Sequence, residues 1–110
     1  MTLIEFEHNI YAVAMVSPIC DIPTIRRLTS TSINLRINVI MGGFIDVFYN
    51  AYTRTVAFAW IYRGQRAFGA DNTGGWHIHP FEDPEYHKAI SGPMTFTDFV
   101  AQLERYPVNE

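Results

Sequence analysis

Histidines and carboxylates are concentrated in one short segment of this chain. Residues 74–87 contain three of the four histidines, His77, His79 and His87, together with three carboxylates, and glycines and prolines lie at both ends and within the segment. In an extended backbone the side chains alternate between two faces, so His77 and His79 are expected to point the same way and Ile78 back toward the protein. Two imidazoles on one face can bind a metal or transfer protons.

Metal binding is one chemistry that this spacing allows. Neutral imidazoles are common ligands of zinc and related metals, so His77 and His79 can chelate one ion. His87, with Asp83 or Glu85, can complete the set of ligands. In this alternative the metal ligands are His77, His79 and His87, and zinc is the expected cofactor.

Proton transfer needs no cofactor and is the other chemistry. One histidine takes a proton from a ribose 2′-hydroxyl, another protonates the leaving oxygen, and an arginine stabilises the phosphate charge. A carboxylate can orient a histidine by accepting its second ring proton, which is the role expected for Asp71. The candidate catalytic residues of such a histidine-dependent ribonuclease are His77, His79, His87, Asp71, Arg66 and Arg54, with Arg63 next. A third interpretation is purely structural, with the pair of histidines bonded to backbone at a strand end.

Length and composition predict one domain over residues 1–110. The chain is 48% hydrophobic and 15% aromatic, which favours a packed core over disorder. Its single cysteine, Cys20, has no partner for a disulfide, which suits a reducing cytoplasm. Neither a signal peptide nor a membrane-spanning run is expected. The net charge of −3 disfavours broad nucleic-acid binding, although seven of the eight basic residues are arginines, which suit local phosphate contacts.

Changes in hydrophobic period predict an α+β domain. Apolar residues at helical spacing between Leu3 and Val13 favour an N-terminal helix that ends at Ser17-Pro18, although some of them also fit strand alternation. Alternating residues then predict an antiparallel meander of four or five strands. The expected strands cover residues 33–39, 44–49, 56–62 and 65–68, with a further edge strand at 22–28. A histidine-rich loop follows.

A capping box predicts the C-terminal helix. The Thr95 hydroxyl can cap the first turn while Asp98, three residues later, reciprocates. Apolar residues at helical spacing then form one stripe that can cover the sheet. These residues are Phe96, Phe99, Val100 and Leu103.

The order of these elements resembles the TumE-type toxin family of toxin–antitoxin modules. The resemblance covers residues 17–103 and is most specific in residues 66–72, residues 76–80, Pro84 and His87-Lys88. It implies a small cytosolic protein encoded beside an antitoxin, of helix-turn-helix or nucleotidyltransferase-like type, which would be its protein partner. A toxin of this kind that acts on RNA is the leading functional hypothesis. An open sheet edge also allows a homodimer or strand addition by a partner.

Two other kinds of function are weighed against the toxin. His77 and His79 with a downstream aspartate, Asp98, also resemble the zinc site of MPN-type deubiquitinating metalloproteases, although the spacing is longer here and the capping box accounts for Asp98. A cupin-like site is disfavoured, because a single small sheet cannot form a double-stranded barrel. The second alternative is a non-catalytic interaction module with Trp76, Phe81 and Tyr86 as its contact surface.

Overall fold

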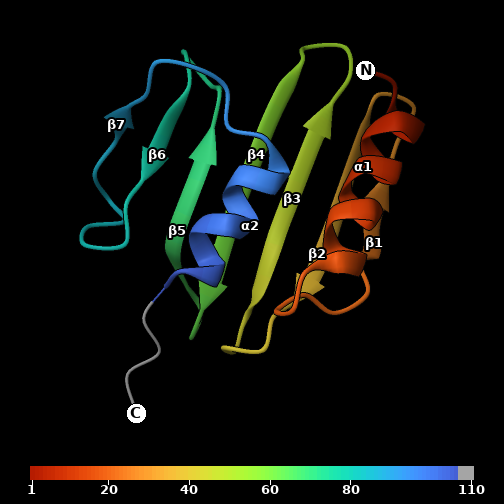
Figure 1. Cartoon of the computed structure of the whole chain (residues 1–110). Helices are drawn as coiled ribbons and strands as arrows, with labels where there is room; N and C mark the ends of the chain where they lie inside the picture. Colours follow the sequence, from red (N-terminus) through yellow and green to blue (C-terminus); the bar gives the residue numbers. More distant parts are fainter. Residues whose placement is uncertain (107–110) are drawn as a thin grey trace.

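Two helices pack on one face of a seven-stranded antiparallel sheet in the computed structural model, which describes residues 1–106 (Figure 1). The strands lie in the sheet in the order of the chain. The elements are α1 (Leu3–Val16), β1 (Thr24–Leu28), β2 (Ser32–Asn38), β3 (Phe44–Asn50), β4 (Thr55–Tyr62), β5 (Gln65–Asp71), β6 (His77–His79), β7 (Lys88–Ala89) and α2 (Phe96–Glu104). The predicted α+β fold with an antiparallel meander is confirmed.

The alternating apolar residues of the central strands build the core. Leu35 of β2 lies opposite Val47 of β3, and Val47 lies opposite Phe58 of β4. All three side chains are buried, because each points to the face that the helices cover. The intervening residues point to the opposite face.

Helix α1 begins with a capping box. Thr2 and Glu5 exchange hydrogen bonds between side chain and backbone, which satisfies two amides of the first turn. The helix ends at Val16, just before Ser17 and Pro18, as expected. Its buried side packs on the sheet, where the rings of Phe6 and Tyr49 stack with centroids 4.5 Å apart.

Helix α2 begins with the second capping box, and the predicted pairing of Thr95 with Asp98 is confirmed. Phe99 lies at the centre of its contact with the sheet. Its ring centroid is 5.4 Å from that of Phe58 and 5.3 Å from that of Phe68. The predicted apolar stripe therefore covers β4 and β5.

The predicted number of strands is wrong, because the segment expected to be a histidine-rich loop contains two more. Residues His77–His79 form β6 and residues Lys88–Ala89 form β7. Strands of three and two residues are too short to show alternation in a sequence, and glycines and prolines flank both of them. At the other side of the sheet, β1 is the expected edge strand, and Pro23 immediately precedes it.

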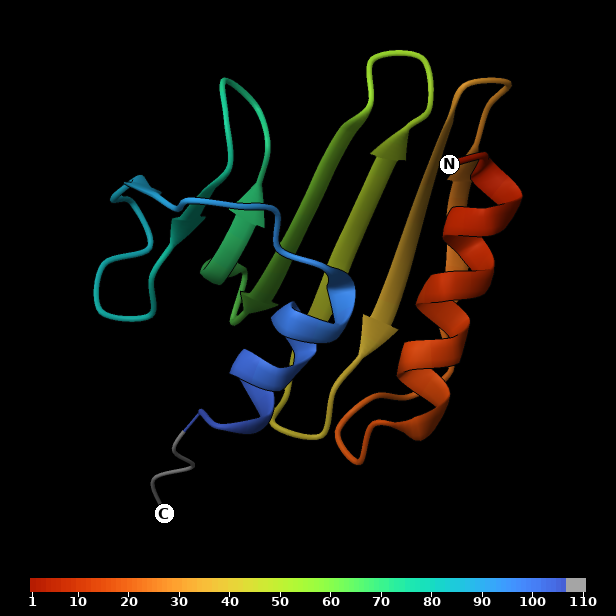
Figure 2. The same cartoon turned by 45° about the horizontal axis from the view of Figure 1, so that its top comes forward.

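The second face of the sheet carries neither of the two helices of the described chain (Figure 2). Small residues line its middle, because Ala59 of β4 lies opposite Gly69 of β5, and Gly69 lies opposite His79 of β6. Side chains from the neighbouring strands can therefore lie flat across this face. Within residues 1–106, neither helix has the length and hydropathy that crossing a membrane would require.

Candidate functional site

The sheet brings Asp71 and the histidines of residues 74–87 together on the face opposite the helices. Asp71 is the last residue of β5 and lies directly opposite His77 of β6. His79 lies on the same face two residues later, as the alternation predicted, whereas Ile78 packs against the core. Ile78 pairs with Lys88 of β7, so the preceding residue, His87, reaches the same place from the edge of the sheet.

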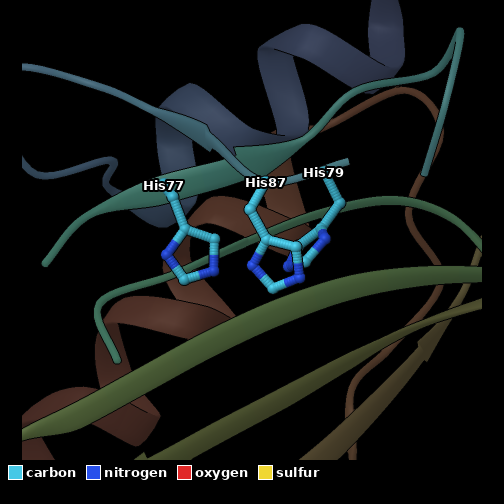
Figure 3. Close-up of side chains that lie close together, drawn as sticks. All are labelled: His77, His79 and His87. Carbon is cyan, nitrogen blue, oxygen red and sulfur yellow. The ribbon is translucent and has the colours of Figure 1, made fainter. Parts of the chain in front are cut away.

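His77, His79 and His87 form one compact group, named here the histidine cluster. One nitrogen atom of each ring lies within 4.8 Å of a nitrogen of the other two. The ring centroids are 5.1 Å apart for His77 and His79, 4.9 Å for His77 and His87, and 4.4 Å for His79 and His87. Figure 3 shows the three rings converging. His79 is buried, with 2% of its surface exposed, whereas His87 is exposed to solvent.

Backbone carbonyls hold one nitrogen of each strand histidine. The Nδ1 atom of His77 lies 3.1 Å from the carbonyl oxygen of Gly75, and the Nδ1 atom of His79 lies 3.1 Å from that of Pro84. The opposite nitrogens converge on Asp71. Its Oδ2 atom lies 3.2 Å from Nε2 of His77 and 3.5 Å from Nε2 of His79. Asp71 thus lies within 3.5 Å of two histidine rings at once.

Arg66 and Gly69 shape the floor beneath His79. A Cβ atom on Gly69 would lie 2.9 Å from Cδ of Arg66 and 3.4 Å from Cδ2 of His79, so both side chains lie close over this glycine. Arg66 Nη2 donates a hydrogen bond of 3.3 Å to the carbonyl oxygen of Pro84, which also contacts His79. Arg66 is therefore beside the cluster, as the sequence predicted.

The surroundings of His79 favour its neutral form. Burial is the largest effect and lowers the pKa of the imidazole below its ordinary value, and the charges of Arg66 and His87 lower it further. Asp71 opposes this shift through its hydrogen bond and its negative charge. The net direction is downward.

Arg54 lies elsewhere. It lines a cavity of about 440 Å³ with Val56, Phe58 and Trp76, on the face that the helices cover. Arg54 ends the turn before β4 with a φ of 61°, and its side chain lies on the face opposite the cluster. Nothing among residues 1–106 joins Arg54 to the histidines in a hydrogen bond or ion pair.

The other predicted ligands and contact residues are distributed around the site. Asp83 and Glu85 are exposed and fall outside the candidate metal group found in residues 1–106, and Asp98 is occupied by its helix cap. Of the three aromatic residues expected to form a contact surface, Tyr86 is 58% exposed. Trp76 and Phe81 pack partly buried against the core.

Three contributors to the site were missed from the sequence. Two are the carbonyl groups of Gly75 and Pro84, which no side-chain pattern can reveal because they belong to the backbone. The third is Gly69, whose lack of a side chain leaves room for the stem of Arg66 beside His79. A glycine inside an otherwise regular strand signals such a close approach, and this signal was available in the sequence.

Comparison of the chain with models of known protein families, with curated proteins and with solved structures found no match. The resemblance to TumE-type toxins, and with it the antitoxin partner, stays a prediction. The functional argument therefore rests on the geometry of the site.

Proposed function

We propose that this protein binds a divalent transition metal at the histidine cluster and uses it in a hydrolytic reaction. The observation that carries this proposal is the set of partners that the ring nitrogens of His77 and His79 face. On each ring, Nδ1 faces a carbonyl oxygen and Nε2 faces the same carboxylate oxygen of Asp71.

A carbonyl oxygen only accepts hydrogen bonds, so each Nδ1 atom must carry the proton that it donates. In a neutral imidazole the other nitrogen then holds a lone pair. On both rings this lone pair faces Oδ2 of Asp71, which also has lone pairs to offer. Two such acceptors at 3.2 Å repel each other unless something positive lies between them.

A single metal ion satisfies all these groups at once. A proton on Nε2 is the other solution, but at His79 burial and the charge of Arg66 disfavour the imidazolium ion that it would create. One divalent ion instead accepts the lone pairs of His77 and His79 and the charge of Asp71. The bonds from Nδ1 to backbone carbonyls are the outer contacts that orient histidine ligands in metal sites.

The size of the cluster fits this interpretation. A tetrahedral zinc site with Zn–N bonds of about 2.0–2.1 Å places its nitrogens about 3.4 Å apart. The nitrogens of the cluster lie within 4.8 Å of one another, so they need to close by up to about 1.4 Å. The exposed ring of His87 is free to make this adjustment. Three imidazoles suit zinc and its neighbours, whereas magnesium and calcium prefer oxygen ligands.

A zinc-type ion held by imidazoles lowers the pKa of a bound water and polarises the bond to be cleaved. The residues of the chain supply the rest. Gly75 and Pro84 fix the ring orientations through their carbonyls, and Asp71 can accept a proton or complete the ligand set. The exposed side of His87 leaves the site open to solvent and to substrate.

Metal titration of the purified protein tests this proposal. We expect one equivalent of zinc to bind with a sub-micromolar dissociation constant in isothermal titration calorimetry. The His87→Ala variant should bind at least about tenfold more weakly. His87 is exposed, so this change should leave the fold intact, as circular dichroism can verify.

His8 provides the matched control, because it is an exposed histidine on α1. Zinc affinity should be unchanged in the His8→Ala variant. Weak binding with no defined stoichiometry, or equal losses in the two variants, would refute the metal centre.

The second candidate is the metal-independent ribonuclease, acting as a toxin. Arg66, whose charge acts directly on His79, favours it, since an arginine beside a histidine suits phosphodiester chemistry. His87 would have to transfer the protons, because both nitrogens of the other two rings are engaged. RNA cleavage that persists in excess chelator, with growth arrest on induction of the wild type but not of His87→Ala, would favour this candidate over the metal centre.

A further inference from the structure

We propose that the substrate of the metal centre is a single-stranded oligonucleotide, with one base in a pocket next to the histidine cluster and the adjoining phosphate on Arg66. This inference rests on the proposed function for its reaction, but its binding step is separate. The pocket lies around the β4–β5 hairpin and the segment between β6 and β7, and has a volume of about 410 Å³. Ligand pockets of small molecules begin at a comparable size.

Aromatic rings form one wall of this pocket. Tyr62, Phe81 and Tyr106 line it. Phe81 is held rigidly, because its ring stacks on Phe68 with centroids 4.2 Å apart and contacts Tyr106 at 4.7 Å. Partly exposed rings that are fixed in this way offer faces for stacking a nucleobase.

Arginines line the same pocket, and the Arg63 guanidinium lies 5.0 Å from the centroid of the Tyr62 ring. Arg63 and Arg66 line the pocket, and none of its lining residues is acidic. Within residues 1–106, neither arginine forms a salt bridge to a carboxylate. Two cations without such partners beside aromatic rings, in a chain whose net charge is −3, mark this place as suited to an aromatic anion.

One hydrogen-bond donor of Arg66 is unpaired among residues 1–106. Its Nη2 atom donates to Pro84, but its Nε atom is buried and has no hydrogen-bond partner in the described part of the chain. Buried donors without partners are rare in folded proteins. A phosphate in the pocket would accept from the guanidinium, and a small turn of the side chain toward it would bring Nε a partner as well.

The position of Arg66 explains why the substrate must be a chain. The carbonyl oxygen of Pro84 contacts both Nη2 of Arg66 and Nδ1 of His79. The proposed metal lies on the opposite side of the His79 ring, at Nε2. Arg66 is thus one imidazole ring away from the reacting group, so it holds a neighbouring phosphate and acts as a positioning residue. A molecule that fills the pocket and also reaches the metal needs more than one phosphate.

Binding of short labelled oligonucleotides to the chelator-treated protein tests this inference without any metal. By fluorescence anisotropy, we expect a six-nucleotide single strand to bind at least tenfold more tightly than a nucleoside monophosphate. Arg66→Met should weaken oligonucleotide binding at least tenfold and Tyr106→Leu at least fivefold. The control Arg26→Met, on the exposed edge strand β1, should bind like the wild type.

A second variant separates binding from folding. Arg63 adopts a φ of 54°, in the left-handed region that glycine occupies without strain. Arg63→Gly should therefore keep or raise thermal stability while weakening the oligonucleotide several-fold. Equal affinities of the wild type, Arg66→Met and Arg63→Gly, or the absence of binding, would overturn the inference.

The outcomes distinguish this inference from the metal proposal. Zinc binding without oligonucleotide binding would leave the metal centre and refute the oligonucleotide. Oligonucleotide binding without zinc binding would refute the metal centre and leave the oligonucleotide site. Both RNA and DNA forms of the strand are to be tested, and selective binding of RNA would support an added contact to the 2′-hydroxyl.

Discussion

At the scale of single residues, Gly69 leaves room for the stem of Arg66 beside His79. The site places an imidazole and the stem of an arginine over a position without a side chain. The Nδ1 atom of the ring faces the carbonyl of Pro84 and Nε2 faces Asp71, so a small rotation of the ring would misplace both. The chemistry of His79 therefore depends on a residue that carries no functional group.

Replacing Gly69 with alanine should disturb this arrangement. The new Cβ atom would lie 2.9 Å from Cδ of Arg66, 3.3 Å from the carbonyl oxygen of Phe58 and 3.4 Å from Cδ2 of His79. We expect a loss of about 1–3 kcal/mol in unfolding free energy, as is usual for overpacking. Zinc affinity should fall as well, because the Arg66 side chain that must move shares the Pro84 carbonyl with His79.

Chemical denaturation and zinc titration check this expectation. The matched control is Gly92→Ala, because a Cβ atom on Gly92 meets nothing within 4 Å. If Gly69→Ala and Gly92→Ala have the same zinc affinity, the close packing over Gly69 is irrelevant to the site.

The lowered pKa of His79 predicts how the metal-free protein responds to acid. Below the ordinary histidine pKa of about 6.5 the unfolded chain takes up a proton, while His79 in the folded chain stays neutral until its own lower pKa is reached. Stability should therefore decrease as the pH falls through this window. Above it, neither state is protonated and the contribution is constant.

The comparison of wild type with His79→Asn isolates this effect. Asparagine retains a donor toward the carbonyl of Pro84 but does not titrate. Urea denaturation in chelator measures the free energy of unfolding at pH 7.5 and at pH 5. This free energy should fall more between the two pH values for the wild type than for the variant. Equal losses would assign the acid sensitivity to other groups.

At the scale of elements, the histidine cluster joins the weakest part of the sheet to a stronger part. Strand β7 has two residues and lies at the edge, held to β6 by the pairs of His77 with Ala89 and Ile78 with Lys88. Short edge strands open easily. A metal bound by β6 and by His87 would cross-link β7 to its neighbour.

Zinc should therefore slow local opening of β7. The amide of Ile90, which donates to the carbonyl oxygen of Trp76 just beyond β7, reports on this region. At free zinc one hundred times its dissociation constant, exchange of this amide should slow by about 100-fold if opening releases the metal. Hydrogen exchange followed by NMR measures it. Amides of the β2–β3 ladder should change much less, and uniform slowing across the sheet would contradict a local cross-link.

Some elements could be predicted from the sequence and others could not, for physical reasons. The strand at residues 33–39 and the capping box of Thr95 rest on local patterns, and the structure retains both. Strands β6 and β7 depend on partners already in the sheet rather than on their own sequence. The position of Arg54 could not be predicted, because it lies in the turn before β4 with a φ of 61°, where strand alternation does not apply.

At the scale of the whole molecule, the helices and the candidate site use opposite faces of one sheet. Core packing occupies the face under α1 and α2, so polar groups can gather on the other face without interrupting it. Asp71, His77 and His79 could be grouped from alternation alone, whereas the position of His87 needed the pairing of β6 with β7. The pocket that holds Arg66 wraps around the end of β4 and β5, and so draws on both faces.

The order of the strands also has a kinetic consequence. Every strand pairs with its neighbours in the chain, so the sheet needs no distant segment in order to grow. Chains with such local pairing fold quickly, because little loop entropy is lost at each step. Synthesis from the N-terminus can add one hairpin after another. Asp71 and the three histidines lie in the last strands to be made. The protein can thus complete most of its sheet before its histidines meet.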